Sequence, residues 1–303
     1  MKYNLLIIRY GELALKGKET RRRFENTLIN NIKKALDFEQ IQFKITRNRG
    51  RIYVYSNQID KCTLILQKIF GITSISPASQ TNDEISSISQ LSRSISKEFI
   101  TKQKSFALRV TRTGTHNYSS QDIAIKIGND IVKMTKAKVN LNKPDFELFI
   151  EIRDKCAYIF TQKILGPGGL PMGTQGNVLA LITHPTSILA SWYIMRRGCK
   201  IFFVNSNNNY TQTLKSFIRN WYANSDISIV NVNKKNYYKN IQRILYEKNC
   251  DAIVTGNCLF NNNNEFLEIK LLKKHISLPI LHPLIAMEME QIIQKCKQIG
   301  ISI

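Results

Sequence analysis

Strand-like and helical patterns alternate regularly over residues 177–303. Apolar segments of strand length lie at Val178–Thr183, Lys200–Asn205, Ile227–Val232 and Ala252–Thr255, and helical periodicity lies at Ser187–Arg197, Gln212–Ala223, Tyr238–Glu247 and Met287–Ile299. Apolar strands that alternate with helices are typical of a parallel sheet covered by helices on both faces. Such sheets bind ligands at the carboxyl ends of their strands. We therefore predict a doubly wound α/β domain whose functional residues lie in the loops after its strands.

Two smaller patterns precede this domain. Over residues 1–60 the order is strand, helix, strand, strand: Tyr3–Arg9, a helix with Phe24, Leu28, Ile32 and Leu36 on one face, Phe43–Ile45 and Arg51–Tyr55. This order predicts a small α+β domain. Residues 61–165 contain a Ser-rich connector at Ser74–Ser96 with a helix of its own, strands at Phe106–Arg112, Phe146–Arg153 and Ala157–Gln162, and helical periodicity at Gln121–Thr135.

The segment Leu165–Gly176 is rich in residues that control backbone conformation, with five glycines and two prolines among 12 residues. This density favours either a linker or a loop in close backbone contact. We place the domain boundaries at residues 1–60, 61–165 and 177–303, with residues 166–176 as the linker.

The chain is strongly basic, with 44 Lys and Arg against 22 Asp and Glu and a net charge of +22. A compact chain of this charge repels itself unless a polyanion neutralises it, so we expect a nucleic acid as partner. The alternative is a salt-adapted surface of solvated lysines. The longest apolar run, near Val178–Ile182, is far shorter than the roughly 20 residues that span a bilayer, so we expect no membrane partner and a cytoplasmic protein.

The six cysteines include no CxxC pair and no histidine at ligand spacing, so we expect small buried thiols and no metal cluster.

Two basic sets are candidate RNA contacts. The first surrounds Gly17 at a predicted helix start and consists of Lys16, Lys18, Arg21, Arg22 and Arg23. Cations beside a helix N-terminus bind phosphates whatever the nucleotide sequence of the nucleic acid. The alternative is a solvated helix face, which has the same pattern of charges. The second set, Arg109, Arg112, Lys126 and Lys133, brackets a polar segment that contains His116 and Tyr118. Those two side chains are suited to hydrogen bonding or stacking on unpaired bases, and an ordinary polar hairpin loop is the alternative.

Several blocks then resemble the tRNA 4-thiouridine synthetase family. They are Ile8-Arg9-Tyr10-Gly11-Glu12-Leu13-Ala14-Leu15-Lys16-Gly17-Lys18; Phe70-Gly71-Ile72 with Ser76-Pro77-Ala78; Asn142-Lys143-Pro144-Asp145 with Glu151-Ile152-Arg153; Gly168-Gly169-Leu170-Pro171 with Gly173-Thr174-Gln175-Gly176; Val254-Thr255-Gly256; and Pro279-Ile280-Leu281-His282-Pro283-Leu284-Ile285 with Ile299-Gly300. The resemblance covers almost the whole chain. It adds Arg9 to the candidate RNA-binding residues.

The resemblance implies an α/β and α+β multidomain fold. Its parts are an N-terminal ferredoxin-like domain, a THUMP domain that grips the acceptor end of tRNA, and a PP-loop ATPase-like, Rossmann-like domain. It also implies ATP and Mg²⁺ as cofactors, because members of the family adenylate a uridine of tRNA before a persulfide cysteine delivers sulfur.

The nucleotide loop departs from the family pattern. Family members have a loop close to Ser-Gly-Gly-x-Asp-Ser, whereas this chain has Thr183-His184-Pro185-Thr186-Ser187, without glycine or aspartate. Pro185 also removes a backbone donor. The degenerate nucleotide-binding residues are then Leu181, Ile182, Thr183, Thr186, Ser187 and Gly256. The alternative role of Thr186 or Ser187 is to cap the next helix.

Other elements of the family's chemistry also differ. Asn257 follows Gly256 where the family has glutamate, Asn231–Lys235 lacks the sulfur-carrying cysteine, and Cys250 and Cys258 do not match its position. We expect no rhodanese-like domain. Three hypotheses stay open: a catalytically reduced tRNA-binding member, an active sulfurtransferase with an atypical loop, and a scaffold for a partner enzyme. A homodimer, or a partner that supplies sulfur transfer or adenylation, fits the first.

Overall fold

The computed structural model describes residues 3–11, 17–48, 50–205, 210–223, 227–229, 236–259 and 262–302. The chain divides into two compact units. The first consists of Met1–Tyr10, Leu36–Gln67 and Thr73–Leu165, and the second of Gly11–Ala35, Lys68–Ile72 and Gly166–Ile303. Within the described residues, no helix is both long and apolar enough to cross a membrane.

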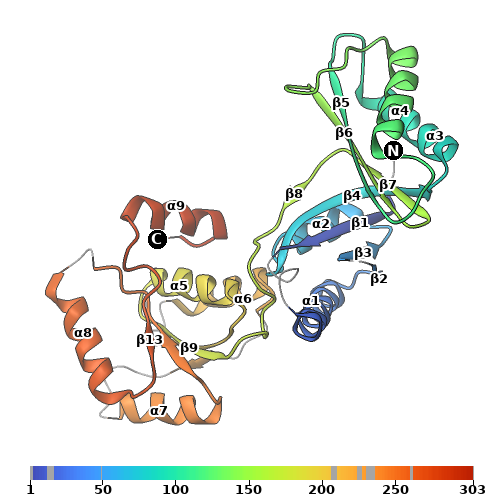
Figure 1. Ribbon diagram of the computed structural model, residues 1–303. Helices are drawn as coiled ribbons and strands as arrows, with labels where there is room; N and C mark the ends of the chain where they lie inside the picture. Colours follow the sequence, from blue (N-terminus) through green and yellow to red (C-terminus); the bar gives the residue numbers. More distant parts are fainter. Residues whose placement is uncertain are drawn as a thin grey trace. The chain divides into compact units, whose positions relative to one another are not determined.

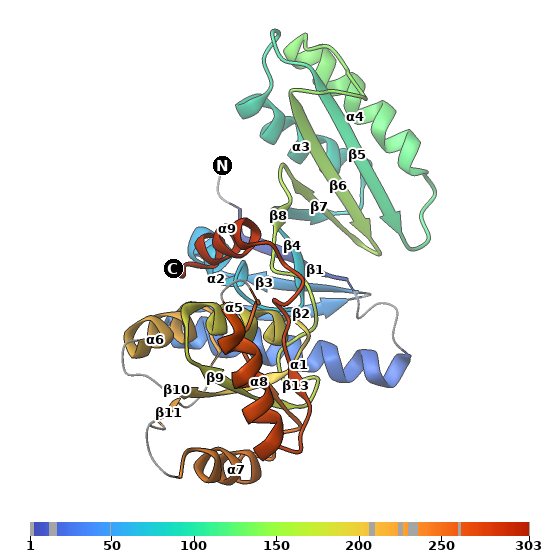
Figure 2. The same cartoon turned by 90° about the vertical axis from the view of Figure 1, so that its left-hand side faces the viewer.

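A single mixed sheet runs through the first unit (Figures 1 and 2). Its strands are β1 (Leu5–Tyr10), β2 (Lys44–Asn48), β3 (Arg51–Tyr55), β4 (Ile72–Asn82), β5 (Phe106–Thr113), β6 (Phe146–Arg153), β7 (Cys156–Phe160) and β8 (Ile164–Leu165). The order is β2-β3-β1-β4-β7-β6-β5, and β8 pairs with β4. β5 and β6 are parallel, whereas β3 is antiparallel to both β1 and β2, and β7 to both β4 and β6.

Strand β4 and helix α3 (Ile85–Phe99) occupy the segment in which we predicted a Ser-rich connector. That prediction is wrong because the serines are interspersed with apolar residues at structural spacing. In β4, Ile75 and Ala78 are fully buried, and in α3 Ile88 and Ile95 are fully buried. The serines of α3 are small enough to be buried between them, as Ser92 is.

Helices α3 and α4 (Ser120–Thr135) pack side by side on one face of β5, β6 and β7 (Figures 1 and 2). Alternate residues of β6 face this helical layer, among them Leu148, Ile150 and Ile152. Since side chains alternate along a strand, Glu151 lies on the opposite face of the sheet. That face carries a second core built around Tyr53 and Tyr158, whose rings stack at 4.8 Å.

Two helices precede β4. Helix α1 (Lys18–Phe38) buries the four residues predicted to form its apolar face, namely Phe24, Leu28, Ile32 and Leu36. Helix α2 (Ile59–Leu66) was not predicted, because its eight residues are too few to display a helical period clearly.

The second unit contains the predicted parallel sheet. Its strands are β9 (Asn177–Ile182), β10 (Lys200–Asn205), β11 (Ile227–Ile229), β12 (Ala252–Val254) and β13 (Ile280–Leu281), in the order β11-β10-β9-β12-β13. Every pair along this order is parallel. The prediction of a doubly wound α/β domain is confirmed.

Helices cover both faces of this sheet (Figure 1). α5 (Pro185–Arg196), α6 (Thr211–Asn220) and α9 (Met289–Ile299) share one core with Ala180 and Ile182, whereas α7 (Tyr237–Glu247) and α8 (Asn262–His275) share the other with Leu179 and Leu181. Successive side chains of β9 therefore point alternately into the two cores. α8 and β13 were missed, because neither carries a strong apolar period.

The Gly- and Pro-rich segment before β9 is held by backbone contacts within the second unit. The carbonyl of Gly198 accepts the amides of Gly173, Thr174 and Gln175 at 2.9–3.1 Å. Gly169 has φ +73°, and a Cβ there would clash with the carbonyl of Arg196, so this position requires glycine. Of the two predicted roles, close backbone contact is the one that the structure displays.

Candidate nucleic-acid interface and nucleotide loop

The start of α1 presents a row of cations. Its described members are Lys18, Arg21, Arg22 and Arg23, and Lys16 lies outside the described residues. Lys18, Arg22 and Arg23 are exposed, and the guanidinium of Arg23 lies 5.2 Å from the ring centroid of Phe24. Arg21 is half-buried, with its Nε 2.8 Å from Oε1 of Glu25. The helix start thus offers exposed positive charge in the orientation that favours anions.

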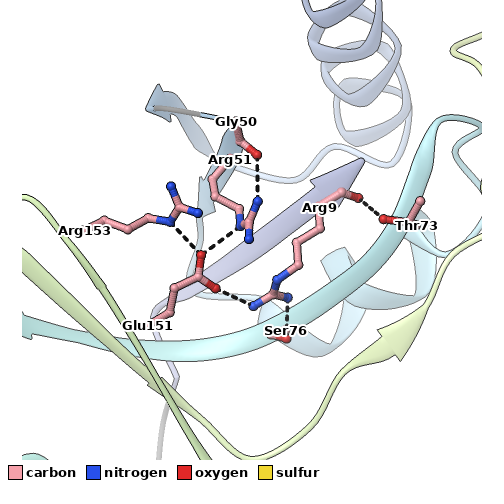
Figure 3. Close-up of polar contacts among 7 residues, drawn as sticks. All are labelled: Arg9, Gly50, Arg51, Thr73, Ser76, Glu151 and Arg153. Carbon is pink, nitrogen blue, oxygen red and sulfur yellow. Dashed lines mark hydrogen bonds and ion pairs between the residues drawn. The ribbon is translucent and has the colours of Figure 1, made fainter. Parts of the chain in front are cut away.

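A second cationic cluster surrounds one buried carboxylate in the first unit (Figure 3). Oε1 of Glu151 accepts hydrogen bonds from Nε of Arg51 at 2.8 Å and from Nε of Arg153 at 2.6 Å. Oε2 of Glu151 accepts one from Nη2 of Arg9 at 2.9 Å. Arg9 also donates through Nη1 to Ser76, 2.9 Å away. Strands β1, β3 and β6 therefore bring three guanidinium groups to a single acid.

Ionisation within this cluster follows from burial and charge together. Burial alone would raise the pKa of the Glu151 carboxyl, but attraction to Arg9 and Arg51 and the bond from Arg153 outweigh it and lower this pKa. Burial lowers the pKa of Arg51 and, together with repulsion from Arg153 and Arg9, outweighs the attraction to Glu151 that raises it. Burial also lowers the pKa of Lys163, and repulsion from Arg9 again contributes. Burial is thus the main cause of both lowered pKa values, and attraction to Glu151 opposes it in each case.

The polar segment of the second basic set lies in the loop between β5 and α4, so the predicted alternative of a hairpin loop is wrong, and internal hydrogen bonds hold the loop. Nε2 of His116 lies 2.7 Å from the carbonyl of Asp154, and its Nδ1 lies 3.2 Å from Nη1 of Arg112. Because the carbonyl only accepts and the guanidinium only donates, His116 is the neutral tautomer protonated on Nε2. The His116 side chain is only 2% exposed. The hydroxyl of Tyr118 donates to the carbonyl of Asp83.

The other members of that set lie on the strands and helix around it. Arg109 donates from Nε to Glu147 at 2.7 Å and from Nη2 to the carbonyl of Leu141 at 2.9 Å. Lys126 is exposed on α4, with its Nζ 3.8 Å from Asp130. Arg112, His116 and Tyr118 are brought together, whereas Arg109 is held in a separate ion pair.

The helix after β9 begins two residues earlier than predicted. α5 starts at Pro185 and its N-cap is His184, so the prediction that Thr186 or Ser187 occupies the cap is wrong. Proline suits the first helical position because the amide there has no partner within the helix. Ser187 lies at the third position, where its Oγ accepts the amides of Thr183 and His184 at 3.4 Å each.

The remaining predicted nucleotide residues lie around this turn. Leu181 and Ile182 are buried on opposite faces of β9. A Cβ on Gly256 would clash with the backbone of Ser187, so the segment after β12 packs directly against the first turn of α5. No space for a side chain separates the two backbones at this point.

A polar chain at the same end of the sheet was missed by the sequence prediction. The hydroxyl of Thr255 donates to Oδ1 of Asn257 at 2.6 Å and lies 2.7 Å from Nδ1 of His282. Since the Thr255 proton goes to Asn257, Nδ1 of His282 is the donor in the second bond. Burial lowers the pKa of His282. The signal was the histidine in the block before α9, to which the prediction gave no role.

Likewise, Arg51, Arg153 and Glu151 were quoted only as parts of strands or blocks. The charged residues inside the otherwise apolar strand Phe146–Arg153 were the available signal, because a buried charge needs a partner. Among the described residues, no group of three or more His, Cys, Asp or Glu gathers as a metal site.

Three family models match successive parts of the chain. The ThiI ferredoxin-like domain matches residues 5–76, the THUMP domain residues 83–162, and the model described as thiamine biosynthesis protein (ThiI) residues 206–302. The predicted fold, an N-terminal ferredoxin-like domain, a THUMP domain and a parallel-sheet domain, is thereby confirmed.

The same assignment follows from similar proteins. A probable tRNA sulfurtransferase of Methanobrevibacter smithii is 30% identical over 99% of this chain and 87% of its own length, and one of Methanothermobacter thermautotrophicus is 31% identical over 99% and 85%. A crystal structure of a Pyrococcus horikoshii protein superposes with a TM-score of 0.85 and 29% identity, covering 98% of this chain and 99% of that one. A 4-thiouridine synthetase, solved as an RNA complex with bound ATP, shares the fold with a TM-score of 0.82 and 24% identity, covering 98% of this chain and 85% of that chain. The family models and the two relatives together show that the chain belongs to the tRNA sulfurtransferase (ThiI) family.

Proposed function

We propose that this chain binds tRNA through its first two domains and is a catalytically reduced member of its family. The THUMP match, the names of its relatives and the RNA in the 4-thiouridine synthetase structure support tRNA as the partner. The net charge of +22 and the exposed cations at the start of α1 provide the attraction that such a polyanion requires.

One observation carries the proposal of reduced catalysis: the amides of Thr183, His184 and Ser187 in the loop after β9 are used internally. The amides of Thr183 and His184 point to the hydroxyl of Ser187, and Pro185 has no amide to offer. A pyrophosphate binds where several backbone amides are free to converge on it. The residues present therefore do not fit the triphosphate of ATP and its Mg²⁺.

Two of the thiols in the second unit, Cys250 and Cys296, support the same conclusion. Sulfur transfer requires a thiolate, since the protonated thiol is a poor nucleophile. Burial, with a contribution from Asp251, raises the pKa of Cys250 to about 11, and burial raises that of Cys296 to about 11. Both thiols therefore stay protonated near neutral pH. The stretch Asn231–Lys235, where the family's cysteine is expected, lies outside the described residues and contains no cysteine.

The second candidate function is an active sulfurtransferase with an atypical loop. The chain of Thr255, Asn257 and His282 favours it, because it places a neutral imidazole at the carboxyl end of the parallel sheet. A third candidate is a scaffold for a partner enzyme, and the exposed Phe266 and Leu267 on α8 favour that one. A homodimer that packs through α8 would bury the same two side chains.

Calorimetry with ATP and Mg²⁺, with and without tRNA, tests the proposal. We expect tRNA to bind, ATP to give no heat of binding, and no AMP to form when tRNA and sulfide are added. The 4-thiouridine synthetase that holds ATP in its crystal structure is the positive control. Tight ATP binding, or tRNA-dependent AMP release, would establish the second candidate instead. Absence of tRNA binding would remove both.

A further inference from the structure

We propose that Arg51 and Arg9, with Arg153, form an anion site that takes a phosphate group above the carboxylate of Glu151. The inference deepens the proposed tRNA binding by naming a site for it, although the site's affinity for phosphate itself can be tested independently. The site lies within the first unit, where β1, β3 and β6 supply its residues (Figure 3).

The charge of the cluster supports the presence of an anion site. Arg9 and Arg51 both bond to the one carboxylate of Glu151, and their side chains are only 13% and 25% exposed. Glu147, a neighbouring acid on β6, is paired with Arg109. Charges so far removed from water are stable only when they are neutralised. The surplus positive charge therefore calls for an anion in addition to Glu151.

The arginine donors that make no bond within the cluster also support an anion site. Arg51 donates through Nε to Glu151 and through Nη1 to the carbonyl of Gly50, and within the described part of the chain its Nη2 has no hydrogen-bond partner. Its side chain is the most exposed of the three arginines, at 25%. Nε of Arg9 is likewise without a partner among the described residues. A ligand arriving from solvent can therefore reach Arg51 without breaking the network.

Phosphate is the anion that suits these groups. Guanidinium donors are planar and fixed in direction, and they pair with phosphate oxygens through two parallel hydrogen bonds. Glu151 fixes the orientation of all three groups before a ligand arrives, which lowers the entropy lost on binding. Nζ of Lys163, 4.4 Å from the ring centroid of Phe149, adds a further cation to the same region. An RNA phosphate and free inorganic phosphate offer the same oxygens, so the experiment has an arm for each.

Arg51→Gln is the informative variant, because Glu151 keeps two arginine partners and the network is not left with an unpaired acid. Arg93→Gln, an exposed arginine on α3, is the control with the same change in charge. Arg51→Lys keeps the charge and removes the paired donors. Urea unfolding of the full-length variants checks that each is folded.

In the RNA arm, tRNA binding is measured by anisotropy over a range of salt concentrations. We expect Arg51→Gln to weaken binding about tenfold and to reduce the slope of log affinity against log salt by about 1. Arg51→Lys should keep the slope and lose affinity, and Arg93→Gln should resemble the wild type. In the phosphate arm, inorganic phosphate at constant ionic strength should raise the unfolding midpoint of the wild type and of Arg93→Gln more than that of Arg51→Gln.

An effect in the phosphate arm alone would assign the site to free phosphate. Identical behaviour of Arg51→Gln and Arg93→Gln in both arms would overturn the inference. If the wild type binds no tRNA at all, the proposed function fails, while the phosphate arm still decides whether the anion site exists.

Discussion

Glu151 illustrates how one side chain can hold together parts of the sheet that are far apart in sequence. It lies 142 residues from Arg9 and 100 from Arg51, and it bonds to both. A carboxylate that is 7% exposed is stable only because these partners replace its hydration. The acid is therefore the member of the cluster whose loss should cost most.

We predict that Glu151→Gln destabilises the protein by about 3 kcal/mol, because three partly buried guanidinium groups lose the charge that neutralises them. Glu147→Gln is the matched control, since the Glu147–Arg109 pair is more than one-third exposed and should contribute less than about 1 kcal/mol. Urea unfolding near neutral pH measures both. Equal losses for the two variants would contradict the special role of Glu151.

The dependence on pH follows from the lowered pKa of Glu151. Because the unfolded carboxyl titrates near its ordinary value of 4.5 and the folded one titrates lower, the unfolded state binds the extra proton first. The stability that the charge contributes is thus complete above pH 4.5 and is lost as the pH falls below it. We predict that the wild type and Glu151→Gln converge in unfolding free energy as the pH is lowered through this range. A constant difference would rule out the ionised carboxylate as its source.

For individual residues, the sequence predicted the kind of contact that a side chain makes better than it predicted the partner of that side chain. Arg9 was predicted as an RNA contact from a block around residue 9, and nothing in its spacing reveals that it bonds to Glu151. His116 and Tyr118 were predicted to offer their rings to bases, and both prove to be tied to backbone carbonyls. Contacts of this kind depend on which strands become neighbours, which local periodicity does not specify.

Among the helices, α1 combines an apolar face with two separate pairs of exposed cations. Arg22 and Arg23 lie near its N-terminus, and Lys33 and Lys34 lie near its C-terminus. Only Arg22 and Arg23 lie near the positive end of the helix dipole, where the first backbone amides have no partner within the helix. The helix thus contains its own control for a charge effect.

We predict that replacing Arg22 and Arg23 by Gln weakens tRNA binding by at least about tenfold, whereas the same change at Lys33 and Lys34 costs about threefold or less. Both double variants lose two positive charges, so non-specific attraction falls equally in the two. Anisotropy at a single moderate salt concentration is sufficient to compare them. If the two double variants bind equally, the start of α1 has no particular part in binding.

The first turn of α5 supports a prediction about stability. Ser187 is 99% buried, and its hydroxyl serves the amides of Thr183 and His184. Ser187→Ala should cost about 1 kcal/mol, since two amides lose their acceptor. Thr186→Ala, in the same turn but outside that bond pattern, is the control and should cost less. Chemical unfolding that shows no difference between the two would mean that water replaces the hydroxyl without penalty.

Elements were predictable where their apolar period was long and strong. The four buried positions of α1 and the continuous apolar strands β9 and β10 were found for that reason. The segment Ser74–Ser96 was misjudged because serine content was given more weight than the spacing of its isoleucines. Helix α8 was missed because its apolar residues do not gather on one buried face, and Phe266 and Leu267 are more than half exposed.

For the molecule as a whole, the order of domains was visible in the sequence but the continuity of the first sheet was not. β4 lies between β1 and β7 in the strand order and pairs with β7 through Ser79–Asn82, so this strand joins the ferredoxin-like and THUMP parts of one sheet. Such pairing joins residues about 80 positions apart in sequence, which no local pattern encodes.

The net charge of +22 leads to the last prediction, which separates a partner-binding surface from a salt-adapted one. If four or five cations neutralise RNA phosphates, raising salt from about 50 to about 200 mM should weaken tRNA binding on the order of 100-fold, because each neutralised phosphate releases condensed counterions. Anisotropy across this range measures the slope, and the unfolding midpoint is followed in parallel. A salt-adapted surface would instead show a midpoint that rises with salt and a tRNA affinity that barely changes. A steep slope of log affinity against log salt with an unchanged unfolding midpoint would mean that the excess charge serves binding. Salt would then screen the attraction to tRNA, while repulsion among the protein's own charges would be too weak to affect its stability.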